Sequence, residues 1–179
     1  MHVWYFAYGS NMQRETFSGR RGITPLRTMA ARVAGWRLVL DKPPLIPMRQ
    51  SFANLVPDPA AEVLGVLYEV TIEDYGHLEL SEAVPLGNYQ RVEVESCPLA
   101  TGAPPVRAFT LVSERRAPAM RPSRRYVDLM VAGALQHGLP VSWVDFLRQV
   151  PADEESAADL QLRALLDEAM RALRKEKPR

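Results

Sequence analysis

The sequence contains a single cysteine, Cys97, so no disulfide can form within the chain. Such sparse cysteine usage is typical of proteins in a reducing compartment. The chain also lacks an excess of charge of either sign, because 22 Lys and Arg residues balance 21 Asp and Glu residues, for a formal net charge of +1. A balanced charge provides no general attraction to nucleic acid or to an anionic membrane surface.

Long apolar runs are absent as well. No stretch approaches the roughly 20 apolar residues that a membrane-spanning helix needs. The N-terminus lacks the basic segment, apolar stretch and cleavage site of a secretory signal. The sequence therefore predicts a cytoplasmic protein that binds neither membrane nor nucleic acid. It also shows no Gly-rich phosphate-binding motif and no zinc-ligand spacing among its three histidines, so we expect no nucleotide or metal site.

What is present indicates one globular domain. Apolar residues make up 47% of the chain and charged residues 24%, and 179 residues suffice for a real hydrophobic core. Fifteen prolines interrupt regular structure, which favours short elements joined by loops. β-rich segments bounded by turn residues come first, and with the N-terminal apolar run they make about six predicted strands. The other five are residues 33–40, 53–56, 63–70, 89–96 and 106–112.

Helical periodicity follows the strands. Residues 123–137 form an amphipathic pattern with Ser123 as a candidate N-cap and Gly138 as a stop, and residues 141–150 form a second pattern. Residues 155–175 form a third, acidic at its start and basic at its end. Its apolar stripe consists of Leu162, Leu165, Leu166, Ala169, Met170 and Leu173. This single stripe suits either packing on the domain or a homodimer contact. Strands before helices predict an α+β fold, with a small mixed or antiparallel barrel-like sheet flanked by helices.

The most distinctive motif is the abrupt end of the first apolar run at Tyr8-Gly9-Ser10-Asn11. Gly9 permits backbone angles that other residues resist, so we expect the strand to turn sharply there. Ser and Asn after such a glycine can leave N–H groups pointing into a concavity that suits a carboxylate or an oxyanion. An ordinary exit from a strand into a turn explains the same four residues.

Three acidic residues, Asp74, Glu79 and Glu82, lie in or next to the segment 75–89 between two predicted strands. A solvated acidic turn, or a helical turn capped near Ser81, is the usual explanation of such a segment.

Residues 5–11, YFAYGSN, resemble the signature opening of the γ-glutamylcyclotransferase family, which is also called the AIG2-like fold. Further segments resemble the family in its own order, namely 53–55 with 63–68, then 78–89, Tyr126 and 138–140. The resemblance runs from Trp4 to Val150. It implies a γ-glutamylcyclotransferase-like domain over residues 1–152 and leaves residues 153–179 as a C-terminal helical extension.

The resemblance also implies roles for individual residues. Glu82 takes the place of the family's catalytic acid/base, and the residues placed in its substrate-binding pocket are Tyr8, Gly9, Ser10, Asn11 and Tyr126. The chain departs from the family's motif beside the glutamate, where Glu79 replaces an aspartate and Ala83 replaces a glycine. Ala83 narrows the backbone freedom after Glu82.

The implied chemistry needs no cofactor. In a small-molecule γ-glutamyl amide, the α-amine can attack the γ-carbonyl carbon, close a five-membered lactam and expel an amine, so that 5-oxoproline is released. Holding the folded conformer supplies much of the rate, since effective molarities of well-oriented intramolecular reactions reach ~10⁵ M or more. One carboxylate can remove the ammonium proton and later protonate the leaving nitrogen. The loop amides can stabilise the oxyanion or hold the α-carboxylate.

Alternatives remain open at this point. Members of the family act on γ-glutamyl amino acids, on γ-glutamyl amines or on γ-glutamyl groups of carrier-protein-bound intermediates. The arginines of residues 115–125 form a solvated loop or a basic patch that attracts an acidic substrate or carrier protein. A catalytically silent AIG2-like module that binds a metabolite is the competing class, although such a module has no need for an acid at position 82.

Overall fold

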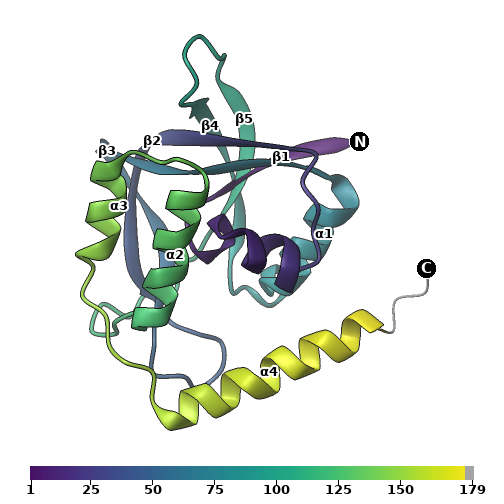
Figure 1. Cartoon of the computed structure of the whole chain (residues 1–179), viewed down its shortest axis with the longest axis vertical. Coiled ribbons are helices and arrows are strands. Elements are labelled where there is room, and N and C mark those ends of the chain that lie inside the picture. The colour runs from purple at the N-terminus through teal and green to yellow at the C-terminus, as the bar shows by residue number, and fades with distance from the viewer. Residues whose placement is uncertain (176–179) are drawn as a thin grey trace.

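The protein is described by a computed structural model that covers residues 1–175. Five strands close into a barrel in the order β1-β3-β2-β4-β5. Neighbouring strands are antiparallel except β1 and β5, which pair in parallel and close the barrel. The strands are β1 (His2–Ala7), β2 (Arg27–Lys42), β3 (Phe52–Thr71), β4 (Gln90–Pro98) and β5 (Val106–Val112). This mixed, barrel-like sheet with flanking helices confirms the predicted α+β class (Figure 1).

The strand β3 corrects one prediction. Residues 53–56 and 63–70 were expected as two strands, but they belong to one strand of 20 residues. Pro57 and Pro59 lie inside it. They are tolerated because the β2–β3 pairing shifts register between Ala34↔Glu62 and Trp36↔Pro57, and the pairing with β1 begins only at Val66.

Helices and helical turns fill the connections. The segment α1 (Ile72–Ser81) is a helix rather than an acidic turn, and the Thr71 side chain caps it by accepting a hydrogen bond from Asp74 N at 3.1 Å. The cap predicted at Ser123 is confirmed, since its side chain accepts from Tyr126 N at 3.2 Å. The other helical segments are η1 (Ser10–Met12), η2 (Glu15–Arg20), η3 (Val84–Leu86), α2 (Arg124–Gln136), α3 (Val141–Arg148) and α4 (Ala157–Lys175).

The core is apolar and aromatic and lies on both faces of the sheet, because successive side chains of a strand point to opposite faces. Phe6, Leu67 and Tyr68 are almost completely buried, and Phe17 stacks on Tyr68 with ring centroids 4.1 Å apart. This packing extends the core from the barrel to η2, which carries Phe17. It fixes η2 beside the end of β1, where the predicted turn begins.

The first half of α4 contacts the loop between β2 and β3. Arg49 N donates to the buried Asp159 side chain at 3.2 Å, and Arg163 forms an ion pair with Glu155 at 2.8 Å. Leu165, on the predicted apolar stripe, is 63% exposed. The later stripe side chains, Leu166, Ala169, Met170 and Leu173, lie outside the described residues. A dimer contact through α4 stays a prediction. Over the described range, no helix has both the length and the apolar character needed to cross a membrane.

Candidate active site

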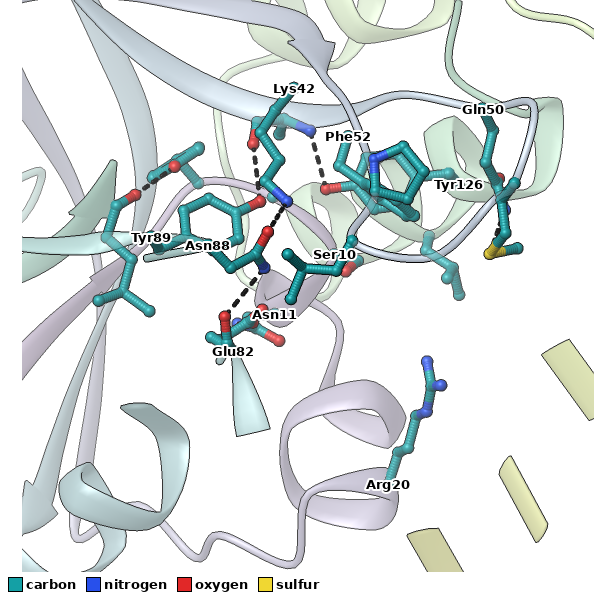
Figure 2. Close-up of a pocket in the computed structure, with 18 of the residues that line it drawn as sticks. Ser10, Asn11, Arg20, Lys42, Gln50, Phe52, Glu82, Asn88, Tyr89 and Tyr126 are labelled. Carbon is teal, nitrogen blue, oxygen red and sulfur yellow. Dashed lines mark hydrogen bonds between the residues drawn. The ribbon is translucent and has the colours of Figure 1, made fainter. Parts of the chain in front are cut away.

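A cavity of about 240 Å³ lies where β1 ends. Its walls come from η1, the loop between β2 and β3, the end of α1, β5, α2 and α4. Figure 2 shows labelled side chains from these distant segments surrounding one space. Every site residue inferred from the sequence lines it, namely Tyr8, Gly9, Ser10, Asn11, Glu82 and Tyr126.

Gly9 is required for a different reason from the one predicted. Its φ is −107° and its ψ is −148°, so it does not use the left-handed conformation. Instead, a Cβ at this position would lie 2.9 Å from Tyr126 Oη and 3.2 Å from Ala53 Cβ. The turn is therefore glycine because α2 and β3 approach its backbone closely.

Glu82 directly follows α1, and its side chain is 18% exposed. Asn11 Nδ2 donates to Glu82 Oε1 at 3.0 Å, and Arg21 Nη2 donates to the same oxygen at 2.5 Å. Arg21 Nε also donates to Asn11 Oδ1 at 2.7 Å, which closes a triangle of three side chains. The turn after β1 and the acidic residue, 71 positions apart in the chain, thus meet in one partly buried network.

The backbone around Glu82 is held by two further features. Ala83 adopts φ +55° and ψ 40°, a left-handed conformation that costs a residue with a Cβ about 1–2 kcal/mol. Ala83 therefore keeps the conformation for which the family's glycine is suited. Asn88 Nδ2 donates to Glu82 O at 3.0 Å, so the chain beyond η3 folds back onto the glutamate.

Three tyrosines, Tyr8, Tyr89 and Tyr126, also line the cavity, and their hydroxyl groups bind the backbone. We call these three residues the tyrosine wall, and Glu82, Asn11 and Arg21 the charged wall. Tyr8 Oη donates to Leu111 O, Tyr89 Oη donates to Ala53 O at 3.3 Å, and Tyr126 Oη accepts from Ala53 N at 3.2 Å. Burial raises the pKa of each of these phenols above its ordinary value. At neutral pH they are therefore uncharged groups that fix the shape of the cavity.

Lys42 and Arg21 line the cavity, and neither was inferred from the sequence. Lys42 is only 2% exposed, its Nζ donates to Asn88 Oδ1, and the ammonium lies 4.6 Å from the centroid of the Tyr89 ring. Burial, and to a lesser extent the nearby Arg115, lower the pKa of Lys42 to about 8. A lysine at the end of a strand and an arginine in a polar stretch are normally solvated, so the local sequence did not predict that Lys42 or Arg21 lines a cavity.

The arginine-rich stretch divides between the two interpretations offered for it. Arg116 forms an ion pair with Asp41, and Arg121 lies 3.7 Å from Asp153 at an exposed position. Arg125 lines the cavity, together with Arg20 from η2 and Arg163 from α4. Part of the stretch is thus structural or solvated, and part contributes positive charge to the cavity.

Comparisons with known proteins agree with this architecture. Residues 62–147 match the model of the AIG2-like family. The protein "Gamma-glutamyl cyclotransferase aclK" of Aspergillus oryzae is 31% identical over 166 residues, which cover 82% of this chain and 60% of that protein. The human protein "Gamma-glutamylcyclotransferase" is 24% identical over 84% of this chain and 79% of its own length. The chain thus spans about three fifths of the Aspergillus relative.

A solved structure described as "Gamma-glutamyl cyclotransferase" has the same fold. It superposes with a TM-score of 0.76 at 20% sequence identity, over 90% of this chain and 98% of the other. Residues 62–147 therefore match the AIG2-like family, and the chain has the fold of γ-glutamyl cyclotransferases.

Proposed function

We propose that this AIG2-like protein is a cofactor-independent γ-glutamyl cyclotransferase that converts a γ-glutamyl amide into 5-oxoproline and a free amine. The observation that carries the proposal is the position of Glu82. A partly buried carboxylate faces the same cavity as the Tyr8–Asn11 turn and is bound by Asn11 and Arg21. Relatives named as γ-glutamyl cyclotransferases support this reaction class.

In the proposed mechanism, Glu82 removes a proton from the substrate's α-ammonium group. The freed amine attacks the γ-carbonyl carbon, so that a new C–N bond forms and the carbonyl oxygen becomes an oxyanion. The intermediate collapses, the original amide C–N bond breaks, and Glu82 returns its proton to the leaving nitrogen, while the ring nitrogen gives up its second proton to solvent. Asn11 and Arg21 keep the carboxylate oriented, and backbone N–H groups of the turn stabilise the oxyanion.

Charge in the cavity favours an acidic substrate. Five basic side chains line it, and Glu82 is the acidic residue among its described lining. Arg20, Arg125 and Arg163 come from three separate elements. This group supports a second candidate within the same reaction class, in which the leaving amine belongs to a larger acidic compound or to an intermediate bound to a carrier protein.

The test is release of 5-oxoproline from a panel of γ-glutamyl amides, comprising γ-glutamyl amino acids, neutral γ-glutamyl amines and larger acidic conjugates. We expect the wild-type protein to release it from at least one of them, and Glu82→Gln to lose about 10³-fold or more in kcat while remaining folded. Glu79→Gln is the matched control, because Glu79 lies on α1 and contacts Arg91 at 3.8 Å rather than the cavity.

Near-wild-type turnover by Glu82→Gln refutes the role of this residue. Tight binding of γ-glutamyl compounds without 5-oxoproline release refutes the proposed cyclotransferase activity and favours a protein that only binds the metabolite. A strong preference for acidic conjugates over neutral γ-glutamyl amines supports the larger acidic substrate.

A further inference from the structure

Lys42 is a buried cation that the proposed mechanism does not use. It makes no ion pair with a carboxylate in the part of the chain that the structure describes. Its ammonium group donates to Asn88 Oδ1 and lies over the Tyr89 ring. An ammonium group withdrawn from water is costly unless an anion compensates it. Because the side chain lines the cavity, the compensating anion can come from a ligand.

Asn88 connects this cation to the backbone of Glu82. Its side-chain oxygen accepts from Lys42, and its side-chain nitrogen donates to Glu82 O at 3.0 Å. Figure 2 shows Asn88 between the two residues, with the Lys42 ammonium directed at it. One amide side chain therefore holds both the Lys42 ammonium and the backbone of Glu82, and the side chains of Lys42 and Glu82 line the same cavity.

The other basic groups of the cavity are placed differently. The Arg21 guanidinium donates to Asn11, Ser81 and Glu82, so each of its three nitrogens already has a partner. Arg20 lies apart from Lys42, Asn88 and Glu82 in Figure 2. The Lys42 ammonium carries three N–H groups and, among the described residues, makes one hydrogen bond, to Asn88 Oδ1, so it keeps donor capacity for a ligand in the cavity.

We propose that Lys42 binds the α-carboxylate of the γ-glutamyl group while Glu82 faces its α-ammonium group. This inference rests on the proposed function, because it assigns the orientation of that substrate. The α-ammonium and α-carboxylate groups of the substrate are both bonded to its α-carbon. The charges of Glu82 and Lys42 are complementary to these two groups. Binding both groups directs the amine toward the γ-carbonyl and leaves the N–H groups of the Tyr8–Asn11 turn for the oxyanion. Lys42 thereby selects substrates whose cyclising group carries an α-carboxylate.

The experiment measures steady-state kinetics of Lys42→Met and Lys42→Arg with a γ-glutamyl amide that the wild-type protein converts. We expect Lys42→Met to raise KM about 10–100-fold and to change kcat much less, since a charge-assisted hydrogen bond of this kind is lost from both ground and transition states. Lys42→Arg keeps the charge and is expected to recover part of the affinity. Thermal melting checks folding, and Lys42→Met should melt at or above the wild-type temperature because it removes a buried charge.

A second readout isolates the carboxylate. Competitive inhibition is measured with 5-oxoproline and with 2-pyrrolidinone, which is the same lactam without the carboxylate. The wild type should bind 5-oxoproline at least about 10-fold more tightly, and Lys42→Met should remove that preference. A preference that survives in Lys42→Met, or a loss confined to kcat, overturns the proposal while the cyclotransferase stands. If the wild type converts no γ-glutamyl amide, the proposed function itself fails.

Discussion

The two walls of the cavity hold their side chains in opposite ways. On one wall, Tyr8, Tyr89 and Tyr126 are anchored through their hydroxyl groups to backbone atoms of β3 and β5. On the other, Glu82 is held through side chains, by Asn11 and Arg21. The first wall fixes shape with neutral groups. The second fixes charge, and its geometry depends on a few ionic hydrogen bonds.

This difference explains why we propose that the tyrosines position the substrate and that Glu82 transfers the proton. Neutral phenols in a buried wall can position a substrate but cannot take a proton at neutral pH, since burial raises each pKa. Proton transfer therefore falls to the charged wall. Changes to that wall should affect turnover and stability together, whereas changes to the tyrosine wall should act mainly through packing.

Breaking the charged wall should have the largest effect. Arg21→Met leaves the partly buried Glu82 without its charge partner and Asn11 without a donor, so we expect a loss of about 1–3 kcal/mol in unfolding free energy and about 10–100-fold in kcat/KM. Arg21→Lys keeps the charge but cannot make all three hydrogen bonds of the guanidinium. Its stability and turnover should therefore lie between those of the wild type and Arg21→Met. Denaturant unfolding and turnover measure both effects. Wild-type stability in Arg21→Met would show that the network contributes nothing.

Crowding the tyrosine wall should have a similar effect on stability and a smaller effect on turnover. Gly9→Ala places a Cβ 2.9 Å from Tyr126 Oη, and the resulting shift should lower the unfolding free energy by about 1–3 kcal/mol and reduce substrate affinity. Gly76→Ala is the control, because nothing lies within 4 Å of the added Cβ and the position is helical. The control should be neutral or stabilising by up to about 1 kcal/mol. Equal melting temperatures for the two variants would contradict the close approach.

A third test uses pH. The pKa of Lys42 is lowered from 10.5 to about 8 in the folded protein, so between these values the unfolded chain binds more protons and unfolding free energy should rise with pH. The rise is at most about 1.4 kcal/mol per pH unit. Nearby charged groups act in both directions, since Arg115 lowers this pKa and Glu82 raises it. Comparison with Lys42→Met between pH 8 and about 9.5, below the ordinary tyrosine pKa, isolates the lysine. Identical pH profiles would contradict a buried lysine.

The smallest predicted effect concerns the backbone beside the charged wall. Ala83→Gly relieves the left-handed conformation at φ +55° and should raise the unfolding free energy by up to about 1 kcal/mol, after the entropy that glycine gains in the unfolded chain is subtracted. Ala132→Gly inside α2 should instead be destabilising by about 1 kcal/mol. Thermal melting distinguishes them, and destabilisation by Ala83→Gly would show that this conformation carries no strain.

The sequence predicted the parts of the molecule that local patterns encode. The Tyr8–Asn11 turn, the Ser123 cap and the helix after it were readable because glycine, capping residues and apolar periodicity act over a few positions. The length of β3 was not readable, since whether Pro57 interrupts a strand depends on which neighbour its edge meets. Glu82 was placed by a family resemblance and not by its local sequence.

The cations that line the cavity near Glu82 were missed by sequence analysis for a physical reason. Arg21 and Lys42 are distant in sequence from Glu82, and their burial results from the closing of the barrel and from the fold of η2. The identity of a charged residue does not show whether tertiary packing will bury it. Even the need for glycine at position 9 arises from α2 and β3, which come much later in the chain.

The most direct measurement is a crystal structure of the Glu82→Gln variant with an unreacted γ-glutamyl amide in the cavity. The account predicts the substrate's α-nitrogen within about 3 Å of the side chain at position 82, and its γ-carbonyl beside the Tyr8–Asn11 turn. A substrate bound with its α-nitrogen directed away from position 82, or bound outside this cavity, would contradict it.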